Sequence, residues 1–127
     1  MIGSDAYNYI NVLGKAANAS QVRNEVLTNN LANVDTPHYK RQDVSFENHL
    51  QTAIAGNSSL DKAIGNVRMD SLSTAIYTDT ASLSYRLDGN NVDVDTENAY
   101  LAQNQIRYYT LVDSISQEFS RIKSVLK

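Results

Sequence analysis

Apolar residues recur at alternating steps of four and three near both ends of this 127-residue chain, and this spacing constrains the fold more than any other feature. In the N-terminal third the pattern consists of Ala6, Ile10, Leu13, Ala17, Ser20, Asn24, Leu27, Leu31 and Val34. Residues at this spacing share one side of an α-helix, as in a coiled coil. Pro37 ends the pattern, because the residue before a proline is driven out of the helical region. We therefore predict a helix that starts at Ser4 or Asp5 and ends near Asn33.

The C-terminal third has the same spacing, formed here by Leu101, Gln105, Tyr108, Val112, Ile115, Phe119, Ile122 and Leu126. Asp93 or Asp95 suits the position that caps a helix N-terminus, and Glu97 in the first turn complements the helix dipole. Lys123 and Lys127 carry the complementary charge at the other end. These features predict a helix from about Thr96 to Val125.

Two long amphipathic helices predict a mainly α fold, in which the N- and C-terminal helices pair as a coiled coil. The polar residues Ser20, Asn24 and Gln105 interrupt the apolar spacing, and such residues fix register and partner choice at a cost in stability. Periodicity alone also fits a helical bundle formed within one molecule, but we favour self-assembly between copies. The residues expected to form this assembly seam are Leu13, Leu27, Leu31, Leu101, Tyr108, Val112, Ile115, Phe119 and Ile122.

The middle of the chain has a different pattern. A short helix is expected from Val44 to Ala55, with Gly56 as its stop, and residues 57–82, rich in Ser, Asp, Asn and Thr, are expected to form a loop. Apolar and polar residues then alternate on both sides of an Asp-Gly-Asn-Asn turn at 88–91, from Leu83 to Val94, which predicts a β-hairpin. We therefore divide the chain into an N-terminal coiled-coil helix (1–36), a central region of loop, short helix and β-hairpin (37–95), and a C-terminal coiled-coil helix (96–127).

Composition and spacing argue against catalysis and ligand binding. With 11 basic and 14 acidic residues the net charge is -3, which does not fit a nucleic-acid-binding protein. The absence of cysteine excludes disulfides and thiol chemistry. The two histidines, His38 and His49, lack the spacing of metal ligands, and a calcium loop around Gly89 would put Arg86 at a ligand position. We expect no enzyme activity, no cofactor, no metal and no small-molecule substrate.

Residues 27–46 read LTNNLANVDTPHYKRQDVSF. This segment resembles the N-terminal signature of the bacterial flagellar rod and hook family, in which an amphipathic helix leads into an Asn-Ile-Ala-Asn-x-x-Thr-Pro-Gly-Tyr-like segment. The matching positions of this rod-family motif are Asn30, Ala32, Asn33, Thr36, Pro37 and Tyr39. Leu31 stands in place of the more frequent Ile, and His38 stands where the family usually has Gly.

A second segment, residues 87–109, resembles the one that precedes the C-terminal helix in a proximal rod protein of the same family. The matching turn residues are Asp88, Gly89, Asn90, Val92, Asp93 and Asp95, and Glu97, Asn104 and Tyr108 match further along. The length of the chain also favours a proximal rod subunit, because distal rod and hook proteins carry large inserted domains. The nearest alternative within the family is the other proximal rod subunit, FlgC.

The resemblance implies a structural subunit of the flagellar basal-body rod, which polymerises helically through its terminal helices and transmits motor torque. It implies a place in the basal body, in the periplasm or cell-wall layer, reached through the flagellar type III export apparatus without a cleaved signal peptide. The implied partners are further copies of the chain, the rod proteins FlgC and FlgF, the adaptor FliE and the ring protein FliF, with no nucleic acid. The alternative from another class is a coiled-coil export adaptor or chaperone, which would not account for the segment from Asn33 to Tyr39.

Overall fold

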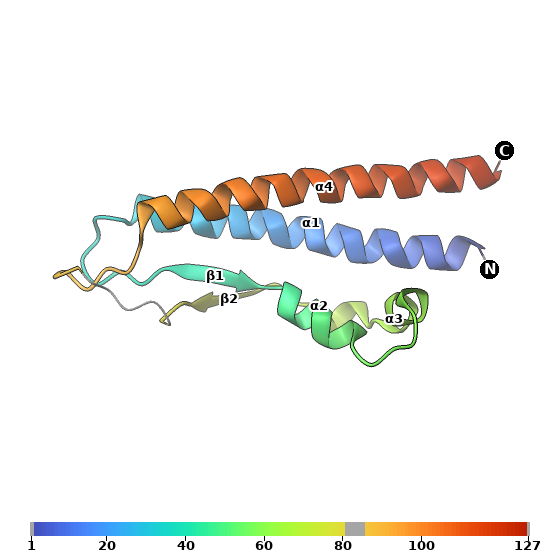
Figure 1. The fold of residues 1–127 in the computed structure, drawn as a ribbon, viewed down its shortest axis with the longest axis horizontal. Helices are drawn as coiled ribbons and strands as arrows, with labels where there is room; N and C mark the ends of the chain where they lie inside the picture. Colours follow the sequence, from blue (N-terminus) through green and yellow to red (C-terminus); the bar gives the residue numbers. More distant parts are fainter. Residues whose placement is uncertain (1, 81–85, 127) are drawn as a thin grey trace.

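The computed structural model describes residues 2–80 and 86–126. In chain order its elements are α1 (Ile2–Ala32), β1 (Gln42–Ser45), α2 (Glu47–Ile54), α3 (Leu60–Asn66), the short 3-10 helix η1 (Met69–Ser71), β2 (Ala75–Thr78) and α4 (Val94–Leu126). Helices α1 and α4 lie side by side and antiparallel, so both chain ends lie at the same end of the molecule (Figure 1). The mainly α fold with long, paired terminal helices is confirmed.

The ends of the long helices follow the local sequence signals. Helix α1 ends at Ala32, five residues before Pro37, close to the predicted end. Helix α4 begins at Val94, two residues earlier than predicted, because the Asp93 carboxylate caps it. The Oδ1 atom of Asp93 accepts hydrogen bonds from the backbone N–H groups of Asp95 (3.0 Å) and Thr96 (3.4 Å). Such a side chain replaces the helical partners that the first turn of a helix lacks.

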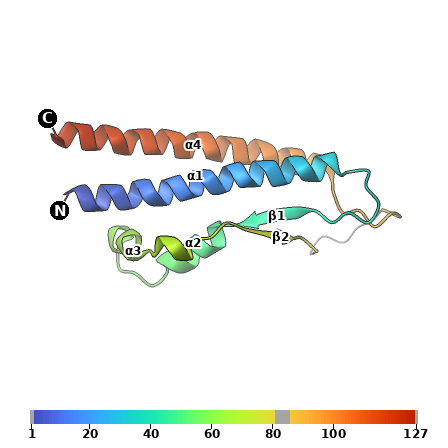
Figure 2. The ribbon, with the colours of Figure 1, turned by 180° about the vertical axis from the view of Figure 1, so that it is seen from behind.

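Helix α1 is the middle layer of the molecule, between α4 and the central region (Figure 2). Ser20, one position of the predicted spacing, faces α4, since Asn104 of α4 donates a 2.7 Å hydrogen bond to its backbone carbonyl. A second buried stripe, which includes Val12 and Ala19, faces the central region. These two residues form the apolar core with Phe46, Ile64 and Leu72. Val12 and Ala19 are not part of the four-three spacing, which therefore gives no sign of this second stripe.

The β-hairpin predicted around residues 88–91 is wrong in its position. The strands are β1 and β2, which pair antiparallel with Gln42 opposite Thr78 and Ser45 opposite Ala75. The expected first strand falls partly on residues 81–85, which lie outside the described residues, and residues 88–93 form an irregular turn. The amide oxygen of Asn90 accepts a 2.7 Å hydrogen bond from the N–H of Val92. This local bond competes with strand pairing.

The expectation of a loop over residues 57–82 is also wrong, since α3, η1 and β2 lie within it. Ser59 caps α3 by accepting a 3.3 Å hydrogen bond from the N–H of Lys62, and Ile64 and Leu72 are buried. The short helix expected from Val44 begins only at Glu47, because Val44 pairs with β2. Over the part of the chain that the structure describes, no helix is both long enough and apolar enough to cross a membrane.

Truncation of Leu27 tests the packing of α1. Its side chain is 0% exposed, so Leu27→Ala should lower the free energy of unfolding by about 2–5 kcal/mol through lost burial and a cavity. The control is Leu60→Ala, because Leu60 is 59% exposed and should cost no more than about 0.5 kcal/mol. Urea unfolding followed by circular dichroism measures both. Equal costs for the two variants would contradict the burial of Leu27.

Candidate functional site

The two segments that match the rod family meet at one end of the molecule, where α1 ends and α4 begins (Figure 1). We call this region the junction and define it as residues 30–43 together with residues 86–97. Backbone hydrogen bonds join its two segments: His38 N–H donates to the carbonyl of Asp88 (2.8 Å), and Asn91 N–H donates to the carbonyl of Tyr39 (3.3 Å). The junction is therefore one folded unit built from distant parts of the chain.

Asn90 holds the backbone that follows α1. Its side-chain amide nitrogen donates to the carbonyl oxygens of Asn33, Val34 and Thr36 at 2.9, 3.0 and 2.9 Å. Carbonyl groups at and just beyond a helix end lack helical partners, and a buried carbonyl without a partner is costly. Asn90 is fully buried and supplies these bonds from the other segment of the junction. The predicted turn residue is therefore a structural clamp.

Asn30 joins α1 to β1 and α4. Its amide oxygen accepts from Gln42 N–H at 2.9 Å, and its amide nitrogen donates to the Gln42 carbonyl at 2.8 Å and to Glu97 at 3.1 Å. A side-chain amide that bonds both backbone groups of one strand residue replaces a neighbouring strand at that point. The Tyr39 hydroxyl donates to the same amide oxygen at 3.2 Å. The motif residues Asn30 and Tyr39 thus close the edge of β1 against α1.

Other predicted residues of the two matched segments stabilise the chain reversal. Thr36 donates through its hydroxyl to the amide oxygen of Asn33 (3.1 Å), and Asn33 donates to the carbonyl of Asn29 (2.8 Å). Asp88 accepts from the Asn90 N–H at 3.1 Å and forms an ion pair with Arg86. Val92 is buried, whereas Ala32, Pro37, Asp93 and Asp95 are exposed.

His38 keeps the backbone conformation of the glycine that the family usually has at this position. Its φ is +62°, in the left-handed region that favours glycine. Gly89 faces it with φ +77°, and a Cβ atom on Gly89 would lie 3.0 Å from Nδ1 of His38. The two residues are therefore packed closely. Gly89 is the position where a side chain would be hindered both by the backbone conformation and by the neighbouring imidazole.

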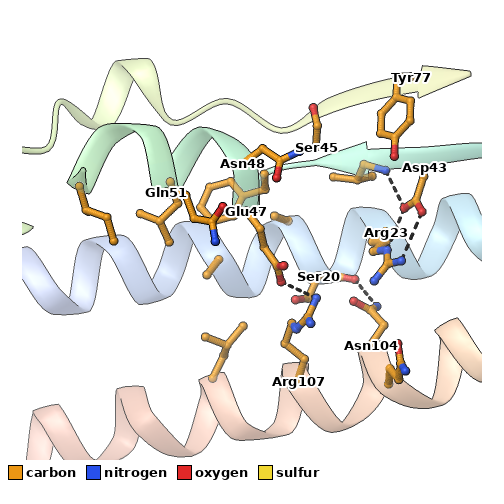
Figure 3. Close-up of a pocket in the computed structure, with 18 residues that line it drawn as sticks. Ser20, Arg23, Asp43, Ser45, Glu47, Asn48, Gln51, Tyr77, Asn104 and Arg107 are labelled. Carbon is orange, nitrogen blue, oxygen red and sulfur yellow. Dashed lines mark hydrogen bonds and ion pairs between the residues drawn. The ribbon is translucent and has the colours of Figure 1, made fainter. Parts of the chain in front are cut away.

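Charged residues of the junction form a cluster with others that lie next to it. Arg41 is buried and forms ion pairs with Asp43 (3.1 Å), Asp79 (2.5 Å) and the fully buried Glu97. Arg23 of α1 forms a second ion pair with Asp43 at 2.8 Å (Figure 3). The aromatic ring of Tyr100 lies 5.2 Å from the Arg41 guanidinium and 5.4 Å from that of Arg23, within the range of cation–π attraction. We call these six residues the charge cluster.

Ionisation of the charge cluster is maintained by its own members. Burial disfavours the charged form of Asp43, but hydrogen bonds and charges from Arg23 and Arg41, with a bond from the Val44 N–H, outweigh burial and hold its pKa below the ordinary 3.8. Burial acts against the charge of Arg41 too, yet Glu97, Asp43 and Asp79 raise its pKa above the ordinary value. Removal of Arg41 would leave the buried Glu97 carboxylate without its cationic partner, which is strongly destabilising.

The predicted assembly seam is only partly in the interface between α1 and α4. Leu27 is buried, and Leu13, Leu31, Leu101, Tyr108, Ile115 and Ile122 are half-buried. Val112 and Phe119 remain 40% and 50% exposed. Asn104, Leu111 and Glu118, each one residue earlier than a predicted position, are more buried. The side of α4 that packs on α1 therefore lies beside the predicted apolar stripe and overlaps half of it.

A groove of about 680 Å³ lies between α1, β1, α2 and α4 (Figure 3). Its apolar lining includes Ala19, Phe46, Leu50 and Leu111. An ion pair between Glu47 of α2 and Arg107 of α4 crosses it. Within residues 2–80 and 86–126, no cluster of three His, Cys, Asp or Glu side chains is arranged to hold a metal ion. The groove thus offers apolar surface and hydrogen-bonding groups.

The chain is similar to known rod proteins over nearly its whole length. The sequence pattern of the family described as "Flagella basal body rod protein" matches residues 10–40. "Flagellar basal body rod protein FlgB" of Bacillus subtilis is 38% identical over 115 residues, which cover 90% of this chain and 89% of that protein. The proteins of the same name from Borrelia hermsii and Escherichia coli are 34% and 30% identical, over 96% and 89% of this chain and 93% and 88% of their own lengths.

Glycine substitutions test the contact between His38 and Gly89. His38→Gly should fold and assemble normally, because glycine adopts the φ of +62° without strain. Gly89→Ala should lower the free energy of unfolding by about 1–3 kcal/mol, because an L residue is strained at φ +77° and its Cβ meets the imidazole. Thermal unfolding measures both. A Gly89→Ala variant as stable as the original chain would contradict the packing described here.

The charge cluster predicts a loss of stability in acid. Because the pKa of Asp43 is lower in the folded chain than the ordinary 3.8, this carboxylate stabilises the fold at pH values above about 4. That contribution falls as the pH drops through the folded-state pKa, where the unfolded chain has already bound its proton. Urea unfolding from pH 7 to pH 3 should show the decrease, and Asp43→Asn should be less stable at pH 7 with a weaker pH dependence. An unchanged slope in Asp43→Asn would rule out this role for Asp43.

Proposed function

Because the chain belongs to the FlgB family of flagellar basal body rod proteins, we propose that it polymerises helically in the proximal rod and transmits motor torque. As a member of this family it is a structural subunit of the flagellar basal-body rod and is located in the basal body. The relatives quoted above all carry the name FlgB, which favours this subunit over FlgC. None of these names supports a coiled-coil export adaptor or chaperone.

The observation that carries the proposal is apolar surface left uncovered along α4. Tyr109, Val112 and Phe119 are exposed although they lie on a helix already paired with α1. Large exposed apolar surface on a small protein marks a site of interaction. Polymerisation would cover it, and many modest contacts repeated around a tube suit the transmission of torque.

The three regions of the chain take different parts in this proposal. Residues 1–36 and 96–127 supply the helical contacts of the assembly seam, and residues 37–95 hold the two helices in a fixed relation. The motif residues act through the junction. Asn30 hydrogen-bonds to Gln42 of β1 and to Tyr39. Asn33 and Thr36 make local hydrogen bonds where α1 ends. None of these roles requires a catalytic group, a cofactor or a small-molecule substrate, and we propose that the protein is not an enzyme.

Membership of the rod family means assembly with other rod components. The specific partners we propose are further copies of the chain, FlgC and FlgF, with the adaptor FliE and the ring protein FliF at the base. The chain would reach the periplasm or cell-wall layer through the flagellar type III export apparatus, without a cleaved signal peptide.

Charged substitutions in the paired helices test the proposal. Leu27→Asp and Ile115→Asp should abolish swimming, because a carboxylate in the interface between α1 and α4 disrupts packing. Export should persist, since the export apparatus passes unfolded chains. The measurements are swimming in soft agar, the amount of chain outside the cytoplasm and its amount in purified basal bodies. The matched control is Gln117→Asp, at an exposed position of α4, which should swim normally.

Normal swimming with Leu27→Asp would show that this interface is not needed for the rod. A chain retained in the cytoplasm, even without substitution, would instead favour the adaptor hypothesis.

A further inference from the structure

Helix α4 carries an apolar ridge beside its contact with α1. The ridge consists of Gln105, Tyr109, Val112, Ser116 and Phe119, and we call these residues the outer ridge. Their spacing of four, three, four and three places them on one side of the helix. Tyr109, Val112 and Phe119 are 61%, 40% and 50% exposed. No residue of the outer ridge is charged.

The groove lies on the opposite side of α4. Its α4 wall is formed by Gln103, Arg107 and Leu111, which are four residues apart and share one side of the helix. Tyr109 follows Arg107 by two residues, so the two side chains leave the helix about 200° apart, in nearly opposite directions. The groove and the outer ridge therefore face opposite sides of the α1–α4 pair.

The charges in the groove are satisfied within the molecule. Arg23 pairs with Asp43, and Arg107 pairs with Glu47 (Figure 3). The remaining lining is apolar or carries uncharged polar groups such as Ser45, Asn48 and Gln51, which are visible around the groove. An occupant with charges would meet no free counter-charge there, whereas an uncharged occupant that is partly apolar would match it.

The outer ridge has this chemistry. Two of its members are aromatic, and the hydroxyl of Tyr109 gives one of them a polar end that suits a half-apolar, half-wet surface. Tyr109, Val112, Ser116 and Phe119 stand at positions i, i+3, i+7 and i+10, close to the spacing by which helices dock in grooves. The ridge and the groove of the same sequence thus match in chemistry, since neither presents an unpaired charge.

We propose that the groove of one subunit receives the outer ridge of α4 from a second copy of the chain. This inference rests on the proposed function and specifies one interface of the rod. Because the groove and the ridge lie on opposite sides, the contact is head-to-tail, and a docked pair leaves the ridge of one subunit and the groove of the other free. Contacts of this kind produce open helical arrays or rings and not closed symmetric pairs.

The outer ridge is too small to hold subunits together without the other contacts of the rod. Two aromatic side chains bury on the order of 150–250 Å² each, so the ridge offers less than the roughly 800 Å² per partner of a stable complex. One contact alone would not hold two free subunits together. We therefore expect the interface in basal bodies and a monomer in dilute solution.

Cross-linking in basal bodies tests the interface, because the chain has no cysteine of its own. Gln51→Cys places a thiol in the groove, and Val112→Cys places one on the outer ridge. After treatment of purified basal bodies with a short bis-maleimide, neither single variant should cross-link to itself. Cells that produce both single variants should give dimers only, and the double variant should give a ladder of multimers. The ladder is specific to a head-to-tail contact.

The matched control replaces the ridge thiol by Gln117→Cys, on another side of α4, and should give no ladder with Gln51→Cys. Cross-links within a single variant would show a symmetric contact and overturn the proposal, as would a product that contains a different rod protein. Absence of products from basal bodies that contain the variants would overturn it as well. If cells with these variants still swim normally, the proposed function in the rod stands and only this interface is wrong. Absence of the unsubstituted chain from basal bodies would contradict the function in the rod itself.

A charge on the ridge provides a second measurement that needs no cross-link. Val112→Lys should reduce incorporation into basal bodies about tenfold or more, because the lysine finds no free counter-charge in the groove. Its helix content should be unchanged, since Val112 is 40% exposed in the single subunit. Gln117→Lys should incorporate normally. Incorporation of Val112→Lys at the level of the unsubstituted chain would overturn the proposal.

Discussion

A buried ion pair joins Arg41 to Glu97 where the central region meets the start of α4. Arg41 follows the motif and leads into β1, and Glu97 lies in the first turn of α4, so their contact fixes the start of α4 against the central region. Two charges out of water are costly unless the remaining hydrogen-bonding groups are satisfied. Asp43, Asp79 and Asn30 supply these bonds, and they come from β1, the end of β2 and α1. A cluster with this requirement favours one arrangement of its elements, because any other arrangement would leave a charge buried and unpaired.

The central region and α4 pack on different sides of α1. The central region packs on one side with an apolar core of Val12, Ala19, Phe46, Ile64 and Leu72, and this supplies burial energy. The α4 side includes polar contacts, such as the bonds from Asn104 to Ser20 and from Gln21 to Tyr108. The Asn104 amide oxygen is buried and has no hydrogen-bond partner among the described residues. Polar groups in a helix interface lower stability but select one register. The polar contacts of α4 therefore fix its register on α1 more than they stabilise the helix pair.

Local signals predicted the long helices and the residues that hold their ends. Pro37 and Asp93 mark the ends of α1 and α4 through backbone sterics and capping, which depend only on neighbours in sequence. The burial of Leu27 followed from heptad spacing in the same way. Long-range contacts were not predictable: Arg41 lies 38 and 56 residues from its partners Asp79 and Glu97, and no local pattern joins them. The pairing of β1 with β2 also joins distant segments, so no local pattern predicts it. The Asp-Gly-Asn-Asn sequence is typical of a hairpin turn and therefore predicts a hairpin in the wrong place.

The position of the apolar stripe on α4 is explained by the partners of its polar residues. The four-three spacing placed Val112 and Phe119 in the predicted assembly seam, and both side chains remain exposed beside the contact with α1. Asn104 faces α1 instead, where its amide nitrogen donates to the Ser20 carbonyl and its amide oxygen is buried without a partner among the described residues. The side of α4 that carries Asn104 and the side that carries Val112 and Phe119 cannot both face α1 fully. A subunit of a polymer gains by leaving one of them free, since apolar surface that satisfies the monomer is no longer available to a neighbour. The polar contacts thus determine which side of α4 remains outside, and the charge cluster holds that side in a fixed direction relative to the groove.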